Sequence, residues 1–117
     1  MIQVKRIYEP KSRSDGVRVL VDRLWPRGLT KAKAGIDEWA KSLSPSAKLR
    51  QWFRHDPSRW EEFKRRYIQE LERDAVAVSR LADQARRSLI TFVYGAQDEI
   101  HNNAVVLKAY IEKWLRR

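Results

Sequence analysis

The sequence contains no cysteine, which excludes disulfides, thiolate zinc sites and cysteine nucleophiles within the chain. A signal-peptide pattern is also missing, because residues 1–8 run directly into alternating polar and apolar positions without a long apolar region. No apolar run approaches the roughly 18–20 residues that cross a bilayer. We therefore expect a soluble, cytoplasmic protein, although the missing cysteines by themselves identify no compartment.

Several familiar active-site signatures are absent as well. The chain has no Walker loop, no GxGxxG or GxSxG motif and no helix-turn-helix pattern. These absences remove the commonest nucleotide-binding and hydrolase classes. They also lead us to expect no cofactor.

The composition is that of a folded domain. A chain of 117 residues is long enough for one hydrophobic core but too short for two. Hydrophobic residues make up 43% and include five tryptophans, which excludes a disordered tail. We therefore treat residues 1–117 as a single domain.

Positive charge is in excess. Lys and Arg number 25 against 15 Asp and Glu, a formal net charge of +10 that favours anionic partners such as nucleic acid or a phosphorylated small molecule. A solvated basic surface without a specific partner explains the same excess equally well. Because no apolar run is long enough to span a bilayer, we expect no membrane partner, and the sequence does not predict an oligomeric state.

Three segments have the pattern of buried strands, at residues 2–8, 17–22 and 88–95. The long segment between the second and the third shows repeated helical spacing, with a helix start at Asp56-Pro57. A strand, helices and a further strand form a βαβ unit whose strands are parallel. The sequence thus predicts an α/β fold, a small and mainly parallel sheet of about three strands flanked by helices, with a multi-helix crossover.

Within the crossover, residues 36–43 carry apolar side chains at a spacing that predicts a short helix. A last helix after the third strand is predicted to be capped by Asn102 or Asn103. The aromatic residues on the inward faces of the predicted helices are expected to be mostly buried: Trp52, Phe53, Trp60, Phe63, Tyr67, Tyr110 and Trp114.

The direction of the first strand has two possible interpretations. Residues 9–16, which link it to the second strand, are fewer than the dozen or so that a parallel crossover usually needs. Loop length alone therefore favours an antiparallel hairpin.

Two polar clusters follow the second and third strands. Parallel strands end along one edge of a sheet, where ligands bind in the crevice outside it, so the two clusters should converge. They are Asp22, Arg23 and Arg27 after the second strand, and Asp98, Glu99, His101, Asn102 and Asn103 after the third.

The chemistry of these side chains suits an anion. The free N–H groups of the last helix at Asn102 and Asn103 attract an oxyanion or phosphate, and arginines bind such groups through paired hydrogen bonds. Proton transfer would use Asp22 or Glu99 as base, with His101 as acid or orienting group. We therefore assign catalytic roles to Asp22, Asp98 and His101, and anion-binding roles to Arg23, Arg27, Glu99, Asn102 and Asn103.

Each assignment has a structural alternative. Asp22 is explained as a loop cap or as part of a buried pair with Arg23, and His101 as a helix-entry hydrogen bond. Asp98 and Glu99 suit the start of a helix, where negative charge is favourable. A divalent metal held by Asp22, Asp98 and His101 ranks below a metal-free site, since no HxxxH or HxxEH spacing supports it.

Four stretches together resemble the YeaO-like branch of the family known as domain of unknown function 488. They are VKRIYEP, VRVLVDRLWPRGL, LRQWFRHDPSRWEEFKRRYIQEL and TFVYGAQDEIHNNAVVLKAYIE, and they cover nearly the whole chain. The resemblance implies an α/β domain with a helix between its first two strands, which run parallel. We follow this implication over the loop-length rule.

The resemblance also bears on the site. Asp22 and Arg23 match the family's VDVR-like strand end, and Asp98 and His101 match its Cys-His-Arg element. This chain has Asn102 where that element has Arg, and no cysteine, so thiol chemistry is excluded. The resemblance implies no particular reaction.

The leading hypothesis is an enzyme with an anion-binding crevice that acts on a phosphate-bearing or nucleic-acid-derived substrate. Its rivals are a non-catalytic nucleic-acid-binding or regulatory module, for which the basic surface suffices, and an interaction domain that senses an acidic peptide or metabolite. The sequence does not decide whether the protein is an enzyme.

Overall fold

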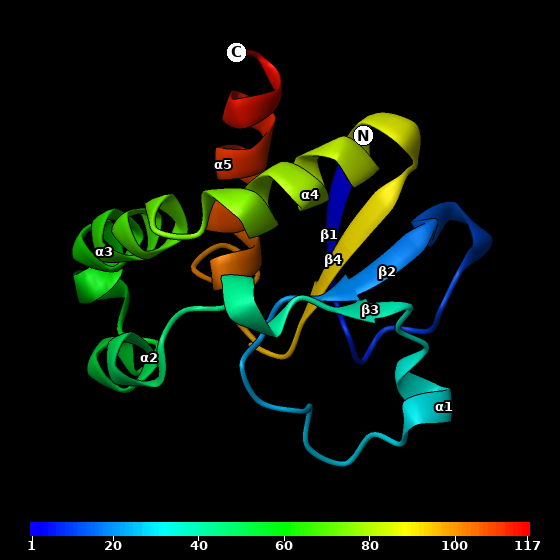
Figure 1. The fold of residues 1–117 in the computed structure, drawn as a ribbon. Helices are drawn as coiled ribbons and strands as arrows, with labels where there is room; N and C mark the ends of the chain where they lie inside the picture. Colours follow the sequence, from blue (N-terminus) through cyan, green and yellow to red (C-terminus); the bar gives the residue numbers. More distant parts are fainter.

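The computed structural model describes residues 1–117 and confirms an α/β fold built on a parallel sheet (Figure 1). The order of the strands is β1-β4-β2-β3, and every neighbouring pair is parallel. The central strand β4 pairs through Phe92 with Val4 on one side and with Val19 on the other. The strands are β1 (Ile2–Arg6), β2 (Val17–Leu20), β3 (Glu38–Trp39) and β4 (Ile90–Tyr94).

Four helices share one hydrophobic core with one face of this sheet. They are α2 (Ala47–Phe53), α3 (Trp60–Glu72), α4 (Ala75–Arg87) and α5 (Asn103–Leu115). Alternate strand residues such as Val19 and Phe92 point into the main core, where they meet buried helix residues such as Tyr67, Leu71 and Leu107. Through this core, the predicted multi-helix crossover, which ends at β4, packs against the sheet.

The opposite face is covered by the loop that follows β2 and by the short helix α1 (Lys31–Ala34), which lies apart from the other helices in Figure 1. A small cluster that includes Leu20, Ala34 and Val93 is buried here. Trp25 and Trp39 pack over it edge to face, with ring centroids 5.6 Å apart. This second cluster holds the post-β2 loop, and therefore the residues after Asp22, in place.

The same face buries an ion network. Arg18 alternates with Val19 along β2, so its side chain lies on the face opposite to α2–α5, where it is fully buried. Its Nη1 lies 2.7 Å from Asp15 Oδ2, and Lys5 Nζ lies 3.0 Å from Asp15 Oδ1. Thr91 Oγ1 donates to the carbonyl oxygen of Asp15 at 2.6 Å. The network joins β1, β2 and β4 to the connection between the first two strands.

Strand β1 is parallel to its neighbour, as the family resemblance implied and against the loop-length rule. The implied helix between the first two strands is only a 3-10 turn, Arg13–Asp15. Fully extended, residues 7–16 would cover roughly 33 Å, whereas a strand of five residues spans about 17 Å, so the connection is long enough to return to the start of β2 even with its 3-10 turn. The network around Asp15 holds this return in place.

The helix predicted at residues 36–43 is wrong. The segment contains the two-residue strand β3 and a 3-10 helix, Lys41–Leu43. The backbone N–H of Ala40 donates to Leu20 O at 2.8 Å, and Trp39 Nε1 donates to Asp22 O at 2.7 Å. Pairing with the free edge of β2 therefore outweighs the local helical spacing and adds a fourth strand to the three predicted.

Of the aromatic residues predicted to face inward from the helices, those at the centre of each face are buried and those at its margins are only half-buried. Phe53, Phe63 and Tyr67 are buried, and Asn102 caps α5 as expected by accepting from the N–H of Val105 at 3.1 Å. The other aromatic residues expected inside are partly exposed: Trp52, Trp60, Tyr110 and Trp114. Trp52 instead packs beneath the guanidinium groups of two arginines.

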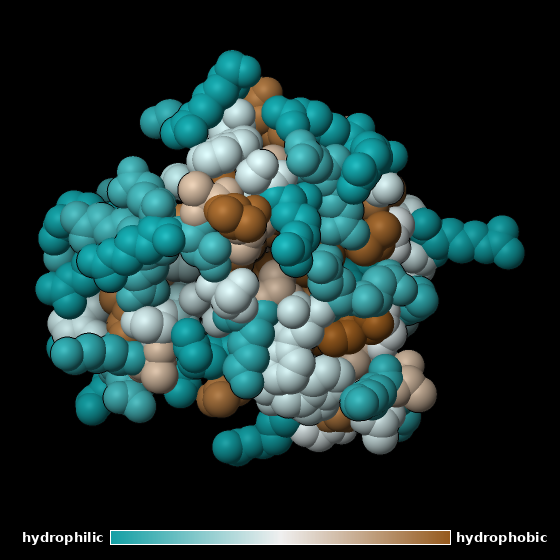
Figure 2. All heavy atoms as spheres, viewed as in Figure 1, coloured by the Kyte–Doolittle hydropathy of each residue, from teal (hydrophilic) through white to brown (hydrophobic).

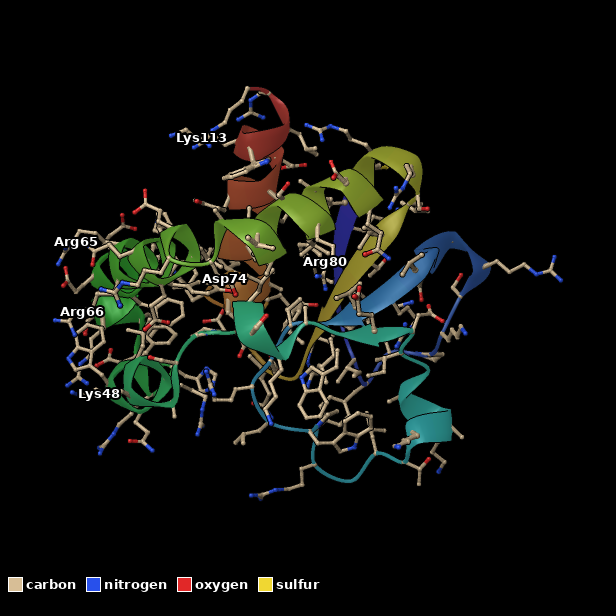
Figure 3. All side chains as sticks on the ribbon, in the orientation of Figure 1. Lys48, Arg65, Arg66, Asp74, Arg80 and Lys113 are labelled. Carbon is tan, nitrogen blue, oxygen red and sulfur yellow. The ribbon has the colours of Figure 1, made fainter.

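The surface is largely hydrophilic on the face shown in Figure 2, with only separate hydrophobic patches. Lys48, Arg65 and Arg66 project outward from α2 and α3 (Figure 3). None of the helices combines the length and the apolar character required to cross a membrane.

Candidate anion-binding site

A crevice of about 240 Å³ lies at the carboxyl edge of the sheet. The loop after β2, the end of α2 and the loop between β4 and α5 all contribute to it, so segments distant in sequence converge there. Its polar lining residues are Tyr8, Asp22, Arg23, Arg27, Arg50, His55, Asn102 and Asn103.

Asp22 lies at the base of the crevice and joins its walls. Its Oδ2 accepts from the backbone N–H of Gly95 at 2.8 Å, and its Oδ1 accepts from Asn103 Nδ2 at 3.1 Å. The same amide nitrogen donates to Val21 O at 2.8 Å. One carboxylate thus ties the end of β2 to the end of β4 and to the first residue of α5.

The burial of Asp22 has an electrostatic consequence. Desolvation raises the pKa of its carboxyl group above the ordinary value of 3.8, although the hydrogen bonds from Gly95 and Asn103, together with His55 and Arg50 nearby, act in the opposite direction. Gly95 allows this close approach, because a Cβ there would lie 3.3 Å from Asp22 Oδ2. Asp22 is the only acidic residue that lines the crevice, and both of its carboxylate oxygens already accept hydrogen bonds.

Basic side chains outnumber this acid. Arg23 uses its Nε to donate to Pro45 O at 3.1 Å. The guanidinium groups of Arg27 and Arg50 form no hydrogen bond or ion pair with other groups of the chain. His55 is the fourth basic side chain that lines the crevice. The crevice therefore carries an excess of positive charge, with donors free to receive an anion.

The backbone at His55 is unusual. Arg54 and His55 have φ values of 51° and 55°, in the left-handed region that non-glycine residues seldom occupy. Two consecutive residues of this kind cost free energy on the order of 1–3 kcal/mol each, and such strain is concentrated at functional sites. The bend turns the chain sharply between α2 and α3 and places His55 at the crevice.

The start of α5 supplies the last wall. Asn102 is buried, caps the helix and also donates from Nδ2 to Asp98 O at 3.0 Å. Asn102 and Asn103 both line the crevice, and the partial positive charge of a helix N-terminus adds to that of the arginines.

Asp98 and His101 form a separate pair. His101 Nδ1 lies 2.9 Å from Asp98 Oδ2, and the His101 ring packs edge to face on Trp60 with centroids 5.2 Å apart. Neither residue lines the crevice, and Glu99 is exposed without a hydrogen bond to its side chain. Asp22, Arg23, Arg27, Asn102 and Asn103 are thus brought together as predicted, whereas Asp98, Glu99 and His101 lie outside this set.

We expect the pKa of Asp98 to be about 2, because its carboxylate accepts from the backbone N–H groups of His101 and Ile100 as well as from the His101 ring. The stability that these bonds contribute is present above the ordinary value of 3.8 and is lost as the pH falls through about 2. NMR titration of the Asp98 carboxyl carbon measures the midpoint.

The His101→Ala variant is the control for this titration. It keeps both backbone donors, so the midpoint should remain well below 3.8. A return to the ordinary value in this variant would show that the imidazole dominates, as in a functional acid–base dyad, and that the two backbone N–H groups contribute little to the low pKa of Asp98.

Two residues that line the crevice were not among the predicted site residues. Arg50 lies on the exposed side of α2, where a basic residue is unremarkable, and His55 directly precedes the helix start predicted at Asp56-Pro57. Asp56 does cap that start, accepting from the N–H of Ser58 at 3.0 Å, which leaves His55 outside the helix and available to the crevice. No group of three or more His, Cys, Asp or Glu side chains is close enough together to hold a metal ion.

The whole chain, residues 1–117, matches a family described as the inactive DUF488-N3 subclade. The protein belongs to the DUF488 family. It is 42% identical to the uncharacterized protein YeaO of Escherichia coli over 98% of this chain and 96% of the relative. This similarity confirms the predicted YeaO-like branch.

Mycobacterial members of the family are similar to a comparable degree. The chain is 40% identical to the uncharacterized protein Mb3100c of Mycobacterium bovis and to Rv3073c of Mycobacterium tuberculosis, in each case over 91% of this chain and 89% of the relative. No solved structure gives a significant match.

Proposed function

We propose that the protein is a non-catalytic, cytoplasmic binding module that holds a phosphate-bearing small molecule or a nucleic-acid-derived phosphate in the crevice. The carrying observation is that three arginines and one histidine surround a single acid whose oxygens already accept two hydrogen bonds. A ligand entering there meets cationic donors before it meets the carboxylate.

The donors suit a phosphate group. Guanidinium groups bind phosphate oxygens through pairs of charge-assisted hydrogen bonds, and those of Arg27 and Arg50 have no partner within the chain. The N-terminus of α5 adds backbone N–H groups next to Asn103. The net charge of +10 would further raise the local concentration of an anion.

Binding is favoured over catalysis by the state of the acidic residues. Asp22 acts as a structural acceptor, and Asp98 and His101 are bonded to each other outside the crevice. The description of the matched subclade as inactive agrees with this proposal. One observation favours the enzymatic rival: burial raises the pKa of Asp22, as it does for many general acids and bases.

The proposal predicts that Arg50→Gln weakens binding of inorganic phosphate or a nucleoside monophosphate by roughly tenfold or more, because one charge-assisted bond contributes about 1.5–3 kcal/mol. Isothermal titration calorimetry at fixed ionic strength measures the change. Arg50 is exposed, so its replacement should leave the melting temperature nearly unchanged.

Arg87→Gln is the matched control. Arg87 ends α4 directly before β4 and therefore lies at the opposite edge of the sheet, yet its substitution removes the same charge. Equal losses in both variants would mean that the ligand responds only to overall charge, which is the solvated-surface alternative. Turnover of a bound phosphoester that is abolished by Asp22→Asn would instead establish the enzymatic rival.

A further inference from the structure

A second cavity, of about 470 Å³, lies between α3 and α5 and is larger than the crevice. Its α3 side is formed by every fourth residue from Trp60 to Glu72, and its α5 side by residues 105–117. The side chains at its base are apolar, among them Ile68, Tyr110 and Trp114. We call this feature the α3–α5 groove.

The groove is open and incompletely buried. Trp60, Tyr110 and Trp114 are only half-buried, and Ile100 at its margin is 69% exposed. An isolated exposed apolar residue is ordinary, but an apolar trench flanked by charged groups is typical of a docking site. The chain contains no segment that covers this trench.

The dimensions match a helix. Residues 60–72 of α3 extend over about 18 Å at the rise of an α-helix, which is a little more than three turns. The α5 side has a similar length, and the small side chain of Ala109 on α5 lets a third helix approach closely. An amphipathic helix of three turns, with apolar residues at i, i+3 or i+4 and i+7, fits such a trench.

The charged side chains at the margin of the α3–α5 groove indicate which kind of partner fits it. Lys64, Lys113 and Arg117 are basic and outnumber Glu72. Because Lys64 Nζ already pairs with Glu61 Oε2 at 2.9 Å, Lys113 and Arg117 carry the positive excess. Lys64 Nζ lies 5.6 Å from the centre of the Trp60 ring, and the Arg117 guanidinium carbon lies 4.4 Å from that of Trp114, so the cations stand directly beside the apolar floor. In Figure 3 Lys113 extends from α5 toward the side of α3.

A second copy of the chain is a poor occupant. Each copy has a formal net charge of +10, and it would bring further positive charge against a basic margin. A helix with Asp and Glu on both sides of its apolar stripe is instead complementary in shape and in charge. We propose that the α3–α5 groove binds an acidic amphipathic helix of a partner protein.

This proposal gives the Asp98–His101 pair a role. The His101 ring packs on Trp60, and the loop from residue 95 to residue 103 faces the crevice through Asn102 and the groove through Ile100. Asp98 accepts from the backbone N–H of Ile100 at 2.9 Å. The pair therefore positions the margin of the groove.

Fluorescence anisotropy with two labelled synthetic peptides tests the proposal. Both peptides have about 14 residues and the same Leu/Trp stripe at helical spacing, but one is flanked by Glu and the other by Lys. We expect the Glu peptide to bind at least tenfold more tightly. Ala109→Glu, which fills and recharges the groove, and Ile100→Ser should each weaken its binding about tenfold.

Val76→Ser is the matched control, because Val76 is 74% exposed on α4 and does not line the groove. It should leave binding unchanged, and far-UV circular dichroism checks that all variants are folded. Equal binding of the two peptides, or no effect of Ala109→Glu and Ile100→Ser, would overturn the proposal. So would loss of binding in Arg50→Gln alone, or a wild-type dimer in sedimentation that Ala109→Glu dissociates.

Discussion

Replacing Asp15 with alanine is expected to destabilise the fold by about 3–5 kcal/mol, because the fully buried Arg18 would lose its anionic partner. The guanidinium would keep only the bond from its Nη2 to Ala34 O, and its Nε already has no partner. Chemical denaturation followed by circular dichroism measures the loss.

Asp83→Ala is the comparison for this variant. Asp83 pairs with Arg86 at the same i, i+3 spacing, but both side chains are about half exposed, so the pair should contribute less than about 1 kcal/mol. Similar losses in the two variants would mean that water reaches Arg18 and that the network is not buried in solution.

The same network makes stability depend on pH. Burial by itself would raise the pKa of Asp15, but the Ser12 amide and the Arg18 and Lys5 cations outweigh burial and hold that pKa below 3.8. Its contribution is therefore present above that value and is lost as the pH falls below it. The Asp15→Ala variant lacks this contribution at every pH.

Replacing Phe63 with alanine should also cost about 3–5 kcal/mol, because it opens a cavity at the centre of an aromatic cluster. The Phe63 ring stacks on Phe53 with centroids 4.2 Å apart and contacts Trp60 and Tyr67 at 5.7 and 5.8 Å. Denaturant titration gives the free energy of unfolding.

Trp60→Ala separates cavity formation from the loss of aromatic surface. Trp60 belongs to the same cluster but is only half-buried, so its replacement should cost less than that of Phe63 despite the larger ring. A larger loss at Trp60 would show that the α3–α5 groove is closed in solution.

The sequence predicted the edge of the sheet at which the site lies more reliably than the members of the site. A run of apolar residues, Val19, Leu20 and Val21, predicts a strand buried on both faces, and Asp22 follows at its end. Because parallel strands end at the same edge, this pairing alone predicts that Asp22 meets Asn103. Asn102 was likewise recognisable as a cap.

What escaped prediction depends on tertiary context. The position of His55 results from two left-handed residues in succession, and no residue type at 54 or 55 requires that conformation. Glu38 and Trp39 form a strand only because the edge of β2 is free beside them. Residues 7–16 form a parallel connection because Asp15 finds Arg18 and Lys5 after folding, a pairing that loop length does not reveal.

The position of β4 at the centre of the sheet also determines when the sheet can form. β1 pairs with no other strand, and Ile2 finds its register partner only at Ile90, near the end of the chain. During synthesis β1 therefore has no partner strand until residues 90–94 have left the ribosome, whereas β2 can pair earlier with β3. Such long-range closure makes folding slow and leaves the growing chain dependent on protection from aggregation.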